Sequence, residues 1–428
     1  MPEPSARPLN SLPLLVLTGI AEALCPHCAQ DTNLQKPWES PIHFGGGRAL
    51  LAPTSDLANL AATCKDLNTI VTPILYHQPQ CVPERRISLL RTLDRRPDLA
   101  RRVKVLRLDF GCDHDIKDED ARAFVLDLVA RYGQPTPPRP QADAGAENGT
   151  LRTSRSEGER VDGDYPMNLL LAMCPNLETF STGLGYFYEF SLLRPASLAY
   201  LKDVYVAHRD TELGIDLESL RGLYLAAPHM ETFTSFMTAD VGPERFPLTN
   251  LRHLRLEQSA ISAEGLRALL GSCPQLESFF YETGGGQISP EQFSITSLRK
   301  LLVRYVPRLK HLELDYQYDA GMTDWREHDD AEDGLDPDPA PGLASLSCLE
   351  KLVIDNDILD KWGRHDPVAT LFPQSLKSLL VTTSEIPFQI GGEDVFAFAS
   401  SVATLLPQLS SIKVRDNGKP RDEYTQIL

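Results

Sequence analysis

Cysteine is sparse in this chain, with eight residues among 428. They stand at positions 25, 28, 64, 81, 112, 174, 273 and 348. This spacing shows no even framework of the kind that closes small secreted domains, so a disulfide scaffold is excluded as the basis of the fold. We therefore expect a reducing compartment, the cytoplasm or the nucleus, in which most thiols act as small buried apolar groups.

Long apolar runs are also missing. No stretch approaches the roughly 20 apolar residues of a membrane-spanning helix, so we expect no membrane partner. The short apolar run at 12–20 follows a single Arg7 and precedes Glu22, without a small-residue cleavage site before Cys25, which argues against a signal peptide. The formal net charge of −17 disfavours nucleic-acid binding, because a phosphate backbone needs a cationic partner.

Catalytic signatures are absent as well. The sequence holds no HExxH, no GxSxG and no kinase motif set. The glycine runs at 45–47 and 284–286 lack the Gly-Lys-Ser/Thr ending of a phosphate loop. We predict no catalytic residue, no cofactor and no enzymatic activity; an enzyme whose site lies on unrecognised loops is the alternative from another class.

Two segments hold few large apolar residues. Residues 133–165 are rich in Pro, Gly, Ala and Ser, and residues 318–344 are strongly acidic and end in a run of prolines. Neither buries enough apolar surface to offset the entropy of ordering it. We predict disordered loops at both places.

One seven-residue phrase recurs along the rest of the chain. It reads CPNLETF, APHMETF, CPQLESF, VPRLKHL and LPQLSSI at 174–180, 227–233, 273–279, 306–312 and 406–412. An apolar helical run precedes it, the proline ends that helix, and the following residues alternate as in a short strand. The repeated unit is therefore predicted to be a helix, a proline stop and a strand.

Further strand patterns lie between these phrases. All the predicted strands begin near residues 103, 177, 201, 230, 251, 276, 309, 349, 376 and 409. From 177 to 409 the eight intervals average 29 residues, within the roughly 20–29 residues of a leucine-rich repeat. We predict an α/β fold in which residues 83–428 form an irregular leucine-rich-repeat solenoid of parallel strands with helices. The alternative is an ordinary α/β sheet with leucine-rich strands.

Residues 1–82 are predicted to form a separate helical segment. A first helix is expected within 9–24, with Ser11 as a cap and Pro13 in the first turn. After an insert at about 25–54, residues 55–76 carry apolar residues at helical spacing, and Pro73 is expected to break that helix.

This segment resembles the F-box family, in the form seen in fungal F-box proteins with leucine-rich repeats. The matching residues are Leu12-Pro13, Val16-Leu17, Ile20, Asp56-Leu57, Leu60, the run 62–67 and the closing run 73–77. The resemblance implies docking on a Skp-type adaptor of an SCF ubiquitin ligase. The docking surface that it implies includes Leu12, Pro13, Val16, Leu17, Leu57, Leu60 and Leu67. The alternative is that these residues form the core of a helical cap on the solenoid.

Cys25-Pro-His-Cys28 is the one metal-like motif. Zinc usually takes four Cys or His ligands in two close pairs, and no second pair has motif spacing. The nearest further ligands are His43, Cys64, His77 and Cys81. We favour an exposed insert with two free thiols and assign no metal site; zinc and a redox pair are the alternatives.

The segment 85–107 is basic, unlike the chain as a whole. Its cations are Arg85, Arg86, Arg91, Arg95, Arg96, Arg101, Arg102, Lys104 and Arg107. Interspersed leucines predict a helix whose arginines face solvent. The alternative is a site for an acidic or phosphorylated partner, because arginine binds anions in a bidentate manner. That site would consist of Arg95, Arg96, Arg101 and Arg102.

Together these features indicate a substrate-recognition adaptor of an SCF-type ubiquitin ligase. In that role the helical segment binds the Skp-type adaptor and the repeats bind a protein substrate whose identity the sequence does not encode. The alternative is a leucine-rich-repeat scaffold that binds a protein without any ligase role.

Overall fold

The computed structural model describes part of the chain. The described residues are 12–29, 54–82, 85–108, 116–132, 164–184, 188–208, 214–242, 245–284, 295–316, 342–356, 358–359, 362, 371–383, 389–390, 393–416 and 425–426. The chain divides into two compact units: Met1–Arg209 with Leu225–His229, and Asp210–Tyr224 with Met230–Leu428.

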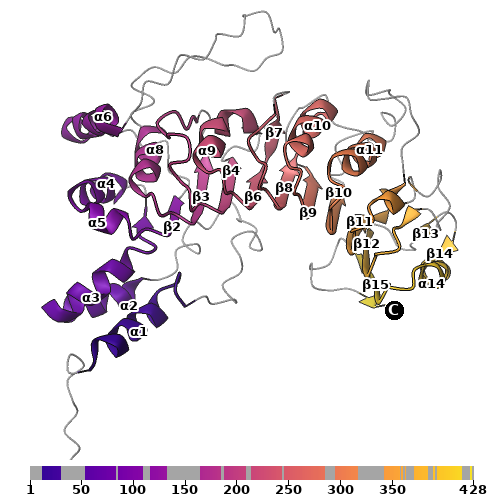
Figure 1. The fold of residues 1–428 in the computed structure, drawn as a ribbon, viewed down its shortest axis with the longest axis horizontal. Helices are drawn as coiled ribbons and strands as arrows, with labels where there is room; N and C mark the ends of the chain where they lie inside the picture. The colour runs from indigo at the N-terminus through magenta and orange to yellow at the C-terminus, as the bar shows by residue number, and fades with distance from the viewer. Residues whose placement is uncertain are drawn as a thin grey trace, which may run out of the picture. The chain divides into compact units, whose positions relative to one another are not determined.

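The first unit begins with three helices (Figure 1). They are α1 (Leu14–Leu24), α2 (Ser55–Thr63) and α3 (Lys65–Leu75). Ala21 and Cys25 from the end of α1, Leu57 and Ala61 from α2 and Val71 from α3 are buried in one core. The expected helices are therefore present. Leu57 and Ala61 lie on the buried face of α2 as their spacing predicted, whereas Val16 and Leu24 of α1 are exposed.

The helix break in this segment differs from the prediction. Pro73 lies inside α3, and the interruption is at Cys64, whose extended backbone (φ −159°, ψ 168°) separates α2 from α3. Pro73 is tolerated because it stands in the last turn, where its missing N–H removes a single helical hydrogen bond and the helix ends two residues later.

Parallel strands follow in the first unit. In sheet order they are β1 (Gln80–Cys81), β2 (Val105–Leu108), β3 (Thr179–Leu184) and β4 (Asp203–His208). The accompanying helices are α4 (Arg86–Arg95), α5 (Pro97–Ala100), α6 (Glu119–Tyr132) and α8 (Asp164–Met173). Helix α8 packs against α4 and α6, so these helices form one layer beside the strands.

The second unit continues the same pattern. Its sheet order is β6 (Thr232–Phe236), β8 (His253–Ser259), β9 (Ser278–Thr283), β10 (His311–Tyr316), β11 (Lys351–Asp355), β12 (Ser378–Thr383) and β15 (Ser411–Asp416), all parallel, then the antiparallel β16 (Thr425–Gln426). Two small pairs are β5 (Ile215–Asp216) with β7 (Thr238–Asp240) and β13 (Gln389–Ile390) with β14 (Glu393–Asp394). The helices are η3 (Leu217–Leu220), α10 (Ala263–Gly271), α11 (Ile295–Tyr305), η5 (Leu343–Ser345) and α14 (Val395–Leu405), and α9 (Arg221–Ala226) crosses the boundary between the units.

The recurring phrase has the structure that the sequence predicted. Helix α10 ends at Gly271, the chain turns through Cys273 and Pro274, and β9 begins at Ser278. The turn is closed by the hydrogen bond from Leu276 N to Cys273 O, at 3.1 Å. Every strand predicted from these patterns is present and begins two residues after its predicted start.

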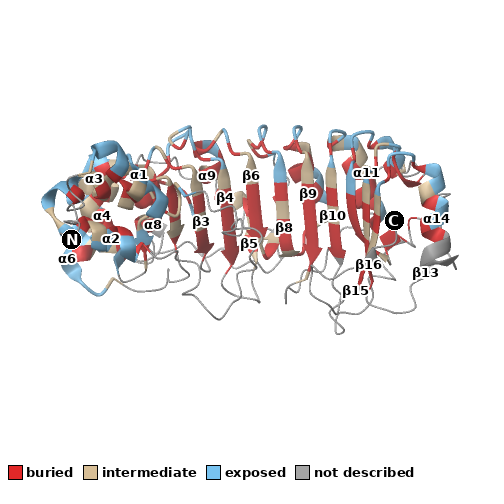
Figure 2. Ribbon diagram, turned by 90° about the horizontal axis from the view of Figure 1, so that it is seen from below, coloured by how far each residue is buried: buried red, intermediate tan, exposed pale blue. Residues whose placement is uncertain are grey.

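Leucines and other apolar residues form the core at one register position. In the second unit this row runs through Leu254, Phe279, Leu312, Leu352 and Leu379, and each is at most 1% exposed. Figure 2 shows β6 and β9 mostly buried and β8 partly exposed, with exposed turns leading into the strands. Burial of such a side chain contributes about 1.5–3 kcal/mol, so neighbouring repeats stabilise one another. The α/β fold with a large parallel sheet is consistent with a leucine-rich-repeat solenoid.

The predicted loops fall largely outside the described residues. Of 133–165, Asp164 and Tyr165 are described and begin α8. Of 318–344, the last three residues are described and lead into η5. Within the described ranges, no helix has both the length and the apolar character that crossing a bilayer requires.

Candidate functional site

Helix α1 exposes large apolar side chains at its beginning. Leu14 is 64% exposed, Leu15 83% and Val16 45%, and Leu24 at the other end of α1 is also exposed. Leu17 and Ala21 lie on the opposite face and are buried against the neighbouring helices. Elsewhere among the described residues, exposed large apolar side chains are scattered singly, which is ordinary for a protein surface. The grouping on α1 is typical of a surface that binds another protein.

The residues implied as adaptor-binding divide between this surface and the core. Pro13 and Val16 are exposed, and Leu12 and Leu60 are partly buried. The other three, Leu17, Leu57 and Leu67, are at most 5% exposed. These three pack the helices together and present no surface to a partner, because helical periodicity turns them inward. Leu14 and Leu15, which the resemblance did not include, contribute more exposed apolar surface.

The predicted arginine site keeps its four members exposed. Arg95 ends α4, Arg96 lies between α4 and α5, and Arg101 and Arg102 follow α5. Arg96 already pairs with Asp98 through two hydrogen bonds of 2.9 and 2.7 Å. Its capacity for bidentate binding of an anion is thus engaged within the chain.

The outward register positions of the second unit's sheet are more polar than its core row. One such row runs through Arg255, Phe280 and Glu313 of adjacent strands. The Arg255 guanidinium lies 3.4 Å from the centroid of the Phe280 ring and pairs with Glu257. Phe280 is 3% exposed beneath this guanidinium, so Arg255 and Glu313 supply the accessible, charged part of this row.

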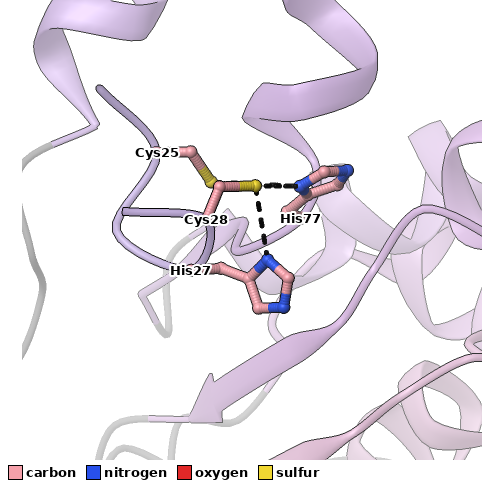
Figure 3. A group of neighbouring side chains, drawn as sticks. All are labelled: Cys25, His27, Cys28 and His77. Carbon is pink, nitrogen blue, oxygen red and sulfur yellow. Dashed lines mark hydrogen bonds between the residues drawn. The ribbon is translucent and has the colours of Figure 1, made fainter. Parts of the chain in front are cut away.

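Four potential metal ligands meet beside the N-terminal helices (Figure 3). Cys25 follows α1 directly, His27 and Cys28 lie in the next turn, and His77 follows α3. The Cys28 Sγ is 3.1 Å from His77 Nδ1 and 3.6 Å from His27 Nδ1, and the Cys25 Sγ is 3.9 Å from His77 Nδ1. All four potential ligand atoms lie within 4.8 Å of one another. We call Cys25, His27, Cys28 and His77 the Cys–His cluster.

The two thiols of the Cys–His cluster differ in acidity. Burial raises the pKa of Cys25, but hydrogen bonds with His27 and His77 lower it by more, to about 5. Burial raises the pKa of Cys28 to about 12, and the negative charge of Cys25 adds to that rise. The imidazoles therefore stabilise a thiolate within the cluster.

A carboxylate supports one of the two histidines. His27 Nε2 lies 3.5 Å from Glu178 Oε2, and Glu178 Oε1 accepts a hydrogen bond of 2.6 Å from Lys104 Nζ. The hydrogen bond with Cys25 raises the pKa of His27, and Glu178 raises it further. Glu178 immediately precedes β3 and Lys104 immediately precedes β2, so the first repeat strands hold this carboxylate in place.

The sequence predicts two free thiols on an exposed insert and no metal site. The structure differs: Cys25 is buried, Cys28 is partly buried, and His77 lies against both sulfurs. His77 lies 49 positions after Cys28, too far along the chain for the short spacing of a zinc-ligand motif. The packing of α1 on α3 brings the two residues together. The sequence signal that could have found it is that both helical runs end in a potential ligand.

Comparisons with known proteins support the repeat region. The leucine-rich repeats described for the FBD-associated F-box protein At5g56370 match residues 214–318. A chain in the crystal structure of the Rad7 and Elc1 complex in yeast aligns over 98% of this chain and 97% of its own, at 13% identity and a TM-score of 0.27. That TM-score is too low to support any statement about function. No curated protein matches the sequence. The family match supports leucine-rich repeats over residues 214–318.

Proposed function

We propose that this chain is a substrate-recognition adaptor of an SCF-type ubiquitin ligase. In this proposal the N-terminal helices dock on a Skp-type adaptor and the repeats bind a protein substrate. The chain itself performs no catalysis, because ubiquitin transfer belongs to partner subunits. The proposed place of action is the cytoplasm, the nucleus or both.

The observation that carries this proposal is the exposed apolar surface of α1, formed by Leu14, Leu15 and Val16. Leaving three large apolar side chains in water is unfavourable, and burial on a partner would recover about 25 cal/mol for each Å² of apolar area. The surface lies in a helical segment that precedes repeats matching those of an F-box protein. That order is the one that the resemblance implies, and it does not depend on the fungal form of the family.

The support for substrate binding comes from the outward face of the second unit's sheet. Arg255 lies over the buried ring of Phe280 and keeps part of its own surface accessible, and the same register row continues through Glu313 to Lys413. Aromatic and arginine side chains supply much of the binding energy at protein interfaces. We propose that the substrate contacts this row.

The test is co-expression of the full chain with a Skp-type adaptor, followed by pull-down. We expect the parent chain to recover a stable complex and Leu15→Asp/Val16→Asp to lose it, because two buried charges at the interface cost several kcal/mol. Leu126→Asp is the matched control, since Leu126 is an exposed leucine on α6. It should bind the adaptor as the parent does.

Two outcomes would contradict the proposal. A folded parent chain that does not bind the adaptor would make α1 part of a helical cap, and the chain a plain leucine-rich-repeat scaffold. Equal binding by the parent and Leu15→Asp/Val16→Asp would show that the α1 surface is not the docking site.

A further inference from the structure

We propose that Cys25, His27, Cys28 and His77 bind one zinc ion as a structural Cys₂His₂ centre. The first support is distance. Tetrahedral zinc has Zn–S bonds of about 2.3 Å and Zn–N bonds of about 2.0–2.1 Å, so sulfur and nitrogen ligands lie roughly 3.6 Å apart. The sulfur–nitrogen distances of 3.1, 3.6 and 3.9 Å in the Cys–His cluster bracket that value.

The second support is the chemistry of the donors. Two sulfurs and two imidazoles in a compact group are the ligand set of structural zinc sites. Four protein ligands complete a tetrahedron and leave no position for a substrate or a reactive water, so the site is structural rather than catalytic.

The third support is the carboxylate behind His27. A zinc-binding histidine commonly donates its other ring N–H to a carboxylate, which fixes the orientation of the ring. His27 has this arrangement: Nδ1 faces Cys28 Sγ, and Nε2 faces Glu178 Oε2. Glu178 is held in turn by Lys104, so the supporting shell is built into the first repeat strands.

Other arrangements account for fewer of these contacts. A disulfide between Cys25 and Cys28 would need neither histidine, yet His77 lies within 4 Å of both sulfurs. Thiols that merely hydrogen bond to the two imidazoles would not need a carboxylate on the far side of His27. A zinc ion would hold both cysteines as thiolates, balance their negative charge and use all four side chains together.

The zinc would fix the N-terminal helices to the repeats of the first unit. Its ligands come from the end of α1 and the end of α3, and Glu178 joins them to the start of β3. The apolar surface of α1 would then be presented from a rigid support. This role is independent of which partner the surface binds.

The test is the zinc content of the purified full chain. After reconstitution with zinc and removal of excess metal, we expect one equivalent per chain in the parent, and loss of that zinc in Cys28→Ser and in His77→Ala. Cys64→Ser is the matched control, because Cys64 is a partly buried cysteine between α2 and α3 and should leave one equivalent bound. His77→Cys supplies a different ligand at the same place and should restore binding, which separates loss of a ligand from misfolding.

A second arm tests the supporting carboxylate. Glu178→Gln should lower zinc affinity by about 10–100-fold in competition with a chelator. Glu277→Gln is its control, since Glu277 holds the same position of a later repeat and pairs with Arg252 and Lys310. Cobalt in place of zinc should give the visible bands of a tetrahedral thiolate site in the parent and not in Cys28→Ser.

Three results would overturn the proposal. They are zinc binding weaker than about 1 μM in the reduced parent chain, a Cys25–Cys28 disulfide in protein purified under reducing conditions, and zinc retained equally by the parent, Cys28→Ser and His77→Ala.

Discussion

Leu312 shows how single side chains hold the repeats together. Its backbone pairs in register with Phe279 on one neighbouring strand and with Leu352 on the other, and all three side chains are fully buried. Since protein interiors are packed as densely as organic crystals, a void at such a position is not filled by its neighbours. The stability of each repeat therefore depends on the two beside it.

We expect Leu312→Ala to reduce the free energy of unfolding by about 2–5 kcal/mol, because it removes buried methyl groups and leaves a cavity. Leu254→Asp should be more damaging, since it places a charge in the same apolar row. Urea unfolding followed by circular dichroism measures both. The exposed Leu405 provides the control, and Leu405→Ala should change stability by no more than about 0.5 kcal/mol. A Leu254→Asp variant as stable as the parent would refute the repeat assignment.

Helix α10 illustrates how closely one element approaches the next. Ser262 caps the helix by accepting a hydrogen bond from Gly265 N. A Cβ atom added at Gly265 would lie 2.8 Å from the backbone oxygen of Val241 and 2.9 Å from its Cβ. Glycine is required there because the helix start and the segment after β7 leave no room for a side chain.

We expect Gly265→Ala to destabilise the second unit, because backbone and β-branched atoms at that distance must move. Gly271→Ala tests the same substitution at the other end of α10, where the nearest atoms are those of the Tyr305 ring at 3.6 Å, an ordinary contact. That control should be neutral or stabilising by up to about 1 kcal/mol, because alanine restricts the unfolded chain. Thermal melts of the two variants compare them directly. Equal melting temperatures would show that the approach at Gly265 is not tight in solution.

At the scale of the whole molecule, the two compact units differ in what stabilises them. The described part of the second unit consists of repeats, and the buried side chains of each strand lie in register with those of the next strand. The first unit adds three short helices to its strands, and their shared core contains only a few apolar side chains. A region with little buried apolar surface unfolds locally at a lower cost in free energy. The N-terminal helices should therefore open more readily than the central strands.

Under the zinc proposal, a chelator should act on the first unit alone. We expect hydrogen exchange to accelerate in α1 and α3, whose ends supply the ligands, and to remain unchanged in β8–β12. A ligand that binds only the folded state stabilises that state. Removal of the zinc should therefore lower the protection of backbone amides from hydrogen exchange in the elements that the zinc joins. Exchange measured by mass spectrometry before and after chelation, with the Cys64→Ser chain as a second reference, resolves these segments. Uniform acceleration throughout the chain would contradict a local role.

The sequence by itself determined the repeat architecture. The proline after each helix and the alternation that follows it are local signals, and they located each predicted strand to within two residues. The prediction that Pro73 breaks the helix was wrong, because a proline in the last turn of a helix is tolerated. The helices are separated at Cys64 instead, where the backbone is extended, and cysteine as a residue type does not predict that conformation.

Only the tertiary structure decided which side chains meet. The F-box resemblance implied a docking surface that includes seven residues, but packing buries Leu17, Leu57 and Leu67 and exposes Leu14 and Leu15. Likewise His77 joins Cys25 and Cys28 because α3 packs on α1. Glu178 meets Lys104 because β3 lies beside β2, and it also contacts His27. Contacts between residues far apart in the chain depend on how whole elements pack, and no spacing within a single sequence encodes that.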